Sequence, residues 1–197
     1  MSHVTSTGID NRKICMWVVI GSECMLFGTL IVNYIIQTTR IQRMDEIDLI
    51  QPTQIFNILL TSTSTFILLM SSLAMVLCLS GLVENNIPKF RKWCFITALF
   101  GTIFLGFQVF EFTEFYLNGL GLTTNLFGSA FFILTGTHGA HVFVGVLILS
   151  TILIFSYKKK LTSKHSVVLE TIGLYWHFVD VIWIIIFTVV YLFVYAP

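Results

Sequence analysis

The sequence predicts an all-α membrane protein with five transmembrane helices. Of its 197 residues, 56% are hydrophobic and only 11% are charged, and the mean hydropathy is +0.88. A soluble domain of this composition would expose too much apolar surface to water. The apolar residues also fall into five runs, each long enough to cross a hydrocarbon core of about 30 Å, which takes about 20 helical residues.

The first three spans are expected near residues 14–36, 55–83 and 93–110. The first follows a short polar N-terminus, and because no small-residue cleavage site ends it, we expect a retained helix rather than a signal peptide. The second follows Gln51-Pro52-Thr53, where a proline just outside the helix favours a helix start. Polar residues close the third.

The last two spans are expected near residues 126–156 and 171–195. The stretch from Phe115 to Tyr157 contains no Asp, Glu, Lys or Arg and is too long for one helix. Asn and Gly residues between 118 and 125 interrupt it, so we expect a tight turn that leads into the fourth helix. No soluble domain or repeat is evident, and residues 1–197 are interpreted as one transmembrane domain.

Basic residues predict the orientation of the chain. Of 11 Lys and Arg residues, two lie in the N-terminal tail, three after the second span and four after the fourth. Nine of the 11 therefore fall on the N-terminal side of the membrane. Because cytoplasmic loops carry an excess of Lys and Arg, the N-terminus is predicted to be cytoplasmic and the C-terminus to lie outside.

Two classes of ligand are disfavoured by composition. A net charge of +1 offers no basic surface for a polyanion, so we expect no nucleic-acid partner. The four cysteines form no CxxC pair and lie in or beside apolar runs, so they are interpreted as packing residues rather than metal or haem ligands. These are Cys15, Cys24, Cys78 and Cys94.

Glu23 is an acidic residue in the middle of the first apolar run. A carboxyl group at that depth of a membrane is costly, so it requires a partner or a function.

The fourth span carries two histidines, His138 and His141, three residues apart on one helix face. This spacing is compatible with a metal pair, but no carboxylate or third histidine stands nearby at a ligand spacing. We therefore favour a hydrogen-bonding seam. Gly128, Gly136, Gly139 and Gly145 are small enough to let neighbouring helices approach it.

The fifth span carries His177 and Asp180, again three residues apart. Such a pair is either a proton relay or a structural couple. We favour the structural couple, because a relay normally needs further protonatable groups on the same helix.

The second and third spans carry weaker signals. Hydroxyl side chains in the second, including Thr61, Thr65, Ser71 and Ser72, are interpreted as packing groups that bond to backbone or to a neighbouring helix. Gln108 and Glu111 close the third span and are compatible with a solvated rim.

Three functional classes remain open from the residues alone. The chain could be a transporter whose buried polar residues line a path, a non-catalytic subunit of a larger complex, or an enzyme with its own cofactor. Five spans without a repeat do not divide into the two related halves that are common in secondary transporters. The enzyme interpretation lacks a ligand set.

The polar residues also carry a resemblance to a known family, subunit III of the haem-copper oxidases. Gly21-Ser22-Glu23 with Met25-Leu26-Phe27 resembles the first common helix of that family, and Asn57 with Leu59-Leu60 and Ser62 resembles its second. The third segment is similar in the following residues: Arg91, Trp93, Thr97, Gly101, Gln108 and Glu111.

The most specific resemblance lies in the last two spans. The run from Phe127 to Gly145 is similar to the family pattern FGS-x-FF-x-x-TG-x-HG-x-HV. His165, Glu170 and the run Tyr175 to Trp183 resemble its H-x4-E-x4-YWHFVDxVW segment. Phe112 departs from the pattern, because many members carry Tyr there.

The resemblance implies a fold and a role. It implies a two-helix pair, formed by the first two helices, and a three-helix bundle, separated by a lipid-filled cleft. It also implies a non-catalytic subunit of a cytochrome c or quinol oxidase that flanks subunit I, in a complex that also contains subunit II. Haems and copper are expected in subunit I, and no cofactor is expected on this chain.

The same resemblance assigns expected roles to individual residues. Glu23 and Arg91 are candidates for lipid binding and for support of proton uptake. Glu23 is expected to be protonated or hydrogen-bonded for much of the time. Six residues are expected to hydrogen-bond within the bundle: His138, His141, His177, Asp180, Glu111 and Glu170.

The five-helix form is similar to many prokaryotic members, which implies a bacterial or archaeal cytoplasmic membrane. Phospholipids and a respiratory supercomplex are further expected partners. A related accessory protein of nitric oxide reductase systems also resembles the pattern and stays open as an alternative.

Overall fold

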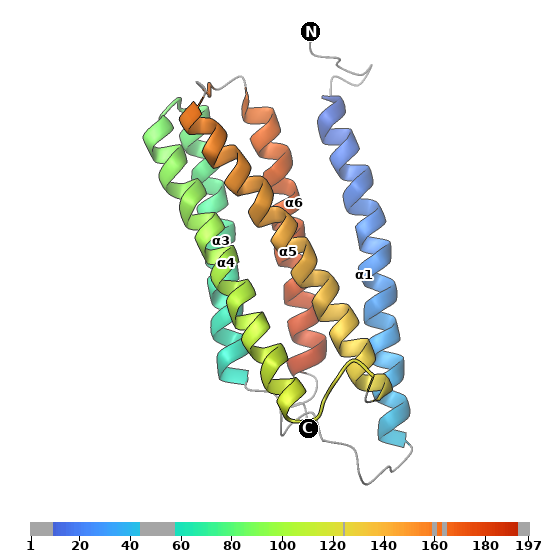
Figure 1. Cartoon of the computed structure of the whole chain (residues 1–197). Coiled ribbons are helices and arrows are strands. Elements are labelled where there is room, and N and C mark those ends of the chain that lie inside the picture. Colours follow the sequence, from blue (N-terminus) through green and yellow to red (C-terminus); the bar gives the residue numbers. More distant parts are fainter. Residues whose placement is uncertain (1–9, 44–57, 124, 159–160, 163–164, 193–197) are drawn as a thin grey trace.

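In the part of the chain that the structure describes, five α-helices run side by side along the molecule (Figure 1). The computed structural model describes residues 10–43, 58–123, 125–158, 161–162 and 165–192. Within these ranges, each of the five helices is long and apolar enough to cross a membrane, which confirms the predicted fold class. They are α1 (Asn11–Arg43), α3 (Ile58–Val83), α4 (Ile87–Leu117), α5 (Leu126–Lys158) and α6 (Ser166–Phe187), which continues into a short π-helix, η2 (Thr188–Leu192).

The helices extend beyond the apolar runs that predicted them. At about 1.5 Å per residue, the 33 residues of α1 span about 50 Å, more than the hydrocarbon core requires. α4 begins six residues earlier than predicted, because the Asn86 side chain accepts a hydrogen bond from the Lys89 amide at 3.1 Å and Pro88 lies in the first turn. The predicted ends at 55–57 and 193–195 lie outside the described residues.

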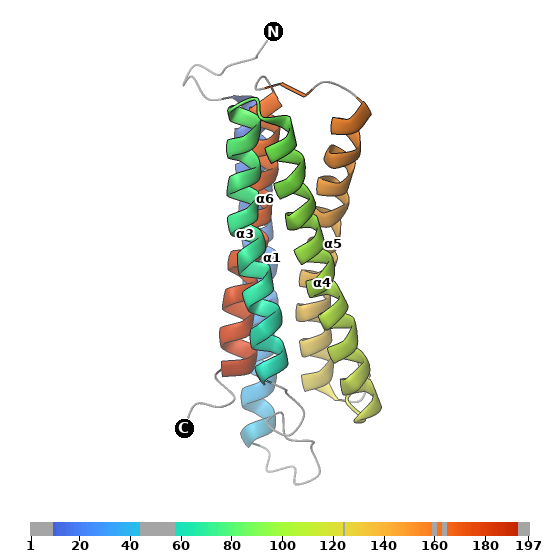
Figure 2. The ribbon, with the colours of Figure 1, turned by 90° about the vertical axis from the view of Figure 1, so that its left-hand side faces the viewer.

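The helices form two layers that are visible when Figures 1 and 2 are compared. α6 lies between α1 and α3 in one layer, and α4 and α5 form the other. Successive helices alternate in direction. α3 packs mainly against α4 and α6, and α5 packs against α4, α1 and α6.

This grouping differs from the one that the resemblance implies. α1 does not form a pair with α3 but packs against α5 and α6. Its buried aromatic residues explain the choice, because Phe27 lies 5.1 Å from the His141 ring and Tyr34 lies 5.8 Å from Phe127, both on α5. α3 instead directs its hydroxyl groups toward α6 and α4.

Trp176 fills the centre of the bundle formed by α3, α4, α5 and α6. A Cβ atom added at Gly101 would lie 2.6 Å from its indole ring, and one added at Gly145 would lie 2.7 Å from it. Both glycines therefore make room for a side chain, whereas for Gly145 the sequence led us to expect close approach of helix backbones. Gly136 differs, since its nearest such neighbour is Phe112 at 3.9 Å.

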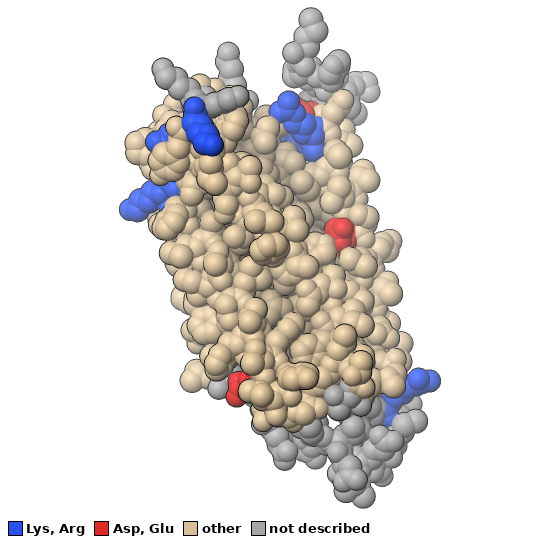
Figure 3. All heavy atoms as spheres, in the orientation of Figure 1, with Lys and Arg blue, Asp and Glu red and all other residues tan. Residues whose placement is uncertain are grey.

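Most of the outer surface is apolar, as a membrane environment requires. Only 11% of the most apolar window of α1 is buried within the chain, compared with 28–39% for the other helices. Lys and Arg gather at one end of the molecule (Figure 3), where six of them belong to helix ends or turns. These are Arg12, Lys13, Lys89, Arg91, Lys92 and Lys158.

Candidate functional site

Glu23 and His141 form a contact between α1 and α5. The Glu23 carboxylate oxygen lies 3.1 Å from Nε2 of His141, and their side chains are 25% and 19% exposed. Nδ1 of His141 lies 2.8 Å from the Thr137 carbonyl, and Tyr175 of α6 donates to the His141 carbonyl at 3.0 Å. Three helices therefore meet at the acid that the sequence singled out, part way across the membrane.

His138 lies on the same helix but has a different environment. Its side chain is fully buried, its ring stacks against Trp183 at 4.9 Å, and it meets Phe104 edge to face at 5.9 Å. Neither ring nitrogen has a hydrogen-bond partner in the part of the chain that the structure describes. The hydrogen-bonding role expected for His138 is therefore not seen within that part.

The metal pair suggested by the spacing of His138 and His141 gains no third ligand. Within residues 10–43, 58–123, 125–158 and 165–192, no three His, Cys, Asp or Glu side chains come together in a metal-binding group. His141 is already engaged by Glu23 and the Thr137 carbonyl.

A polar seam joins α3 and α6. The Ser72 hydroxyl lies 2.6 Å from Nδ1 of His177, the Trp176 indole donates to Ser71 at 3.0 Å, and the Trp183 indole donates to Thr65 at 2.9 Å. Ser71 and Thr65 also donate to backbone carbonyls of their own helix. The packing role predicted for these hydroxyls is thus confirmed by their contacts.

Asp180 lies about one helical turn after His177 on α6 and is only 4% exposed. Neither of its oxygens has a hydrogen-bond partner among the described residues, so His177 and Asp180 do not bond to each other directly. His177 instead bonds to Ser72 of α3, and Asp180 is buried on the same part of α6. The expected couple is therefore not a direct contact.

Gln108 and Glu111 are buried, at 7% and 6% exposure, rather than part of a solvated rim. They lie inside because α4 continues to Leu117 instead of ending near them. Thr61 donates to the Glu111 carboxyl at 2.7 Å, and Tyr191 of η2 also hydrogen-bonds to this carboxyl. Gln108 donates to the Thr135 carbonyl at 2.6 Å, so the pair ties α4 to α3, α5 and η2.

Two further predicted residues lie near the basic end of the molecule. Glu170 at the start of α6 forms an ion pair with Lys13 of α1 at 2.6 Å. Arg91 donates to the hydroxyl and the carbonyl of Ser156, and its guanidinium lies 4.2 Å from the centre of the Tyr157 ring. Both residues therefore tie helix ends together.

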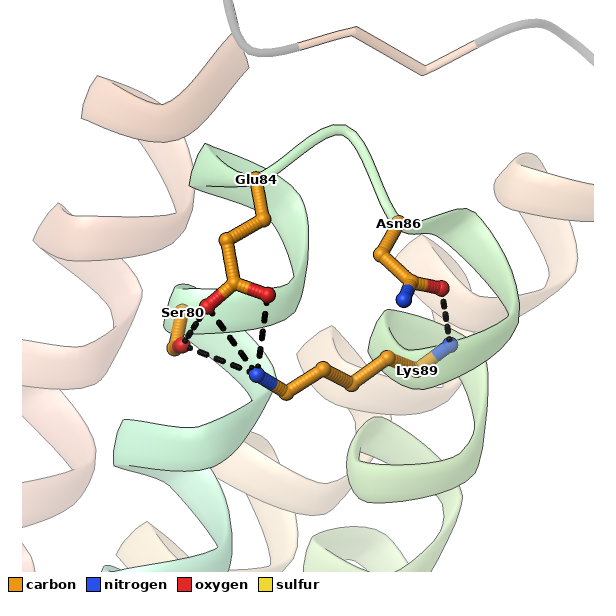
Figure 4. Close-up of polar contacts among 4 residues, drawn as sticks. All are labelled: Ser80, Glu84, Asn86 and Lys89. Carbon is orange, nitrogen blue, oxygen red and sulfur yellow. Dashed lines mark hydrogen bonds and ion pairs between the residues drawn. The ribbon is translucent and has the colours of Figure 1, made fainter.

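The turn between α3 and α4 holds a polar cluster that the sequence did not point to (Figure 4). Lys89 lies 3.0 Å from both Glu84 oxygens and 3.2 Å from the Ser80 hydroxyl, which donates to Glu84 at 2.7 Å. The hydrogen bond from Ser80, together with that from Lys89, lowers the pKa of the Glu84 carboxyl below its ordinary value of 4.5. The i, i+4 spacing of Ser80 and Glu84 was the available signal.

The contacts describe a helix bundle held by buried hydrogen bonds, with a partly exposed acid–imidazole contact between α1 and α5. In the hydrocarbon core of a membrane, such bonds fix the register of neighbouring helices, because unpaired polar groups cannot form hydrogen bonds with water there.

Known proteins resemble the chain over most of its length. A family model described as cytochrome c oxidase subunit III matches residues 2–195. Cytochrome c oxidase subunit 3 of Bacillus sp. (strain PS3) is 35% identical over 182 residues, which cover 92% of this chain and 86% of that protein. Quinol oxidase subunit 3 of Bacillus subtilis (strain 168) is 36% identical over 192 residues, which cover 98% and 91%.

Proposed function

The chain belongs to the cytochrome c oxidase subunit III family, and on this premise we propose that it is a non-catalytic subunit of a proton-pumping haem-copper terminal oxidase in a prokaryotic cytoplasmic membrane. The observation that carries the proposal is a match over residues 2–195 that includes every helix. Relatives named for cytochrome c and for quinol oxidases match at 35% and 36% identity, so the proposal covers both electron donors.

The proposed role is to flank and stabilise subunit I, next to subunit II, and to support proton uptake. Haems and copper would be bound by subunit I. On this chain, the histidines of α5 do not fit such a group, because His138 is enclosed by Trp183 and Phe104 and His141 is engaged by Glu23. What its residues supply is a rigid bundle with a partly exposed acid inside the membrane.

Glu23 and Arg91 are the residues proposed to serve proton uptake and lipid binding. One carboxylate oxygen of Glu23 lies 3.1 Å from Nε2 of His141, and the Glu23 side chain remains 25% exposed within the membrane-spanning part of α1. It can therefore exchange a proton with a group outside the chain. Arg91 lies at the basic end, where anionic phospholipid headgroups would gather. Its bonds to Ser156 hold it in place there.

The proposed orientation places the basic end in the cytoplasm. Six of the Lys and Arg residues at described positions lie at this end, and Arg40 and Arg43 lie at the other.

Purification from native membranes tests the function. The chain is tagged, the membranes are solubilised in mild detergent, and the purified sample is examined by reduced-minus-oxidised spectroscopy and peptide identification. We expect haem signals and a subunit I polypeptide, and oxygen consumption with either cytochrome c or quinol then identifies the donor. A colourless preparation without partners would contradict the proposal and favour a transporter, with Glu23 as the residue to test for ion movement.

A further inference from the structure

His177 is a half-buried polar residue that uses only one of its two ring nitrogens in a hydrogen bond within the described chain. Its Nδ1 lies 2.6 Å from the Ser72 hydroxyl, while its other nitrogen has no hydrogen-bond partner among residues 10–43, 58–123, 125–158 and 165–192. The side chain is only half-buried, so this nitrogen is open to whatever covers α3 and α6.

The imidazole lies deep in the membrane. It is 11 residues from the start of α6, which corresponds to about 16 Å along the helix and thus to the middle of a hydrocarbon core about 30 Å thick. Ser72 is likewise 11 residues from the end of α3, so the two helices place their contact at the same depth. Neither water nor a lipid headgroup is available at that level.

The surroundings of His177 are otherwise apolar. We define the α3–α6 face as His177 and five exposed aliphatic residues that lie within two helical turns of Ser72 or His177 along the chain: Leu69, Leu73 and Val76 of α3 and Val181 and Ile184 of α6. α3 contains no Asp, Glu, Lys or Arg, and Asp180 points inward, with 4% exposure. The face therefore has a single hydrogen-bonding group in an uncharged surface.

We propose that the α3–α6 face is the surface on which a transmembrane helix of the partner oxidase subunit docks, with a hydroxyl or carboxamide side chain that hydrogen-bonds to His177. Acyl chains cannot satisfy an imidazole nitrogen, and hydrogen bonds between helices favour association within a membrane. A charged partner is disfavoured because the face offers no counter-charge. This inference rests on the proposed function, since it assigns the surface used by that partner.

The contact between α1 and α5 makes a useful contrast. Glu23 and His141 satisfy each other there at 3.1 Å, so that pair needs no outside group to hold its hydrogen bond. By contrast, His177 has one hydrogen bond, between its Nδ1 and Ser72, and its Nε2 needs a hydrogen-bond partner from another chain.

Photo-crosslinking in the assembled complex tests the surface directly. A photoreactive amino acid is placed at Leu73 or Val181 on the face, and at Leu147 of α5 as a control that is equally membrane-exposed but lies in the other helix layer. We expect adducts with an oxidase polypeptide from both face positions and adducts with lipid from Leu147.

The outcomes separate this inference from the proposed function. Lipid adducts, or adducts with a second copy of this chain, from Leu73 and Val181 in a preparation that contains the oxidase subunits would overturn the docking surface alone. A preparation without oxidase subunits would overturn the proposed function as well.

A pair of variants tests the hydrogen bond itself. Ser72→Ala removes only the bond inside the chain, whereas His177→Phe removes both bonds. We expect His177→Phe to lower the ratio of chain bound in the oxidase complex to unbound chain by about threefold to tenfold, the range typical of one hydrogen bond between membrane helices. We expect Ser72→Ala to leave this ratio near that of the wild type. An equal loss in both variants would show that the imidazole acts only within the chain and would contradict the proposal.

Discussion

At the scale of single residues, the Thr137 carbonyl decides which nitrogen of His141 carries a proton. A carbonyl can only accept, so Nδ1 must donate to it at 2.8 Å. Nε2 then either accepts from a protonated Glu23 or, in the imidazolium form, donates to the carboxylate. Both forms contain the same number of protons, so the bond between α1 and α5 is kept whichever partner holds the shared proton.

Glu23→Gln tests that interpretation. The carboxamide can still donate to Nε2 of His141, so we expect the variant to assemble like the wild type while proton uptake falls. His177→Ala removes the imidazole that we propose bonds to the partner, and Asp180→Ala removes a buried side chain of α6, so both are expected to lower retention of the chain in the complex. The ratio of this chain to its partners after purification measures the effect, and loss of the complex in Glu23→Gln with normal behaviour of the other two would refute the assignment.

Glu84 gives the α3–α4 turn a dependence on pH. Because the hydrogen bonds from Ser80 and Lys89 lower its pKa in the folded protein, the stabilisation is present above the ordinary value of 4.5 and is lost as the pH falls through the lower folded value. After correction for the intrinsic pH dependence of amide exchange, we expect the protection of amides at the start of α4 to fall in acid in the wild type. Glu84→Gln should show lower protection already at neutral pH and little further change in acid, and an unchanged acid response in this variant would exclude Glu84 as the cause.

At the scale of helices, the glycines of α5 are not equivalent. Gly145 faces the Trp176 ring, where a Cβ would come within 2.7 Å, whereas Gly136 has free space to 3.9 Å. We expect Gly145→Ala to destabilise the bundle by about 1–3 kcal/mol through overpacking. Gly136→Ala is the matched control and should be neutral or slightly stabilising, because alanine favours a helix. The midpoint temperature of unfolding of the purified complex measures both, and equal midpoints would contradict the packing of Trp176.

Existence and order of the helices could be predicted from sequence, because each apolar run must cross the membrane. Their partners could not. Helical periodicity shows that Ser71 or Trp176 lies on some face, but the bond between them joins residues 105 positions apart, and several pairings of five apolar helices would bury similar area. For the same reason the packing of α1 against α5 and α6 became visible only in the structure.

The polar residues were predictable to different degrees. Glu23 stood out because a lone acid in an apolar run needs a partner, although nothing in the sequence pointed specifically to His141. Gln108 and Glu111 were placed at a rim because the apolar run ends there, while the cap at Asn86 and the continuation to Leu117 put them inside the helix. Helix ends depend on capping contacts that hydropathy does not report.

At the scale of the whole molecule, the charge distribution predicts orientation. With the basic end in the cytoplasm, an alkaline phosphatase fused at the end of the chain should be active outside the membrane, and one fused in the turn between α3 and α4 should be inactive. The opposite pattern would reverse the proposed orientation. Fusion proteins in intact cells give the measurement, with equal expression as the control.

We infer that this chain supports a terminal oxidase without catalysing its reaction. The most direct measurement follows oxygen consumption and proton release by the oxidase in vesicles, prepared with and without this chain. We expect the complex without the chain to start consuming oxygen but to take up protons less well and to lose activity sooner during turnover. Complete loss of oxygen consumption from the start, with the cofactors of the remaining subunits intact, would contradict it, as would activity that is unchanged in rate, proton release and duration.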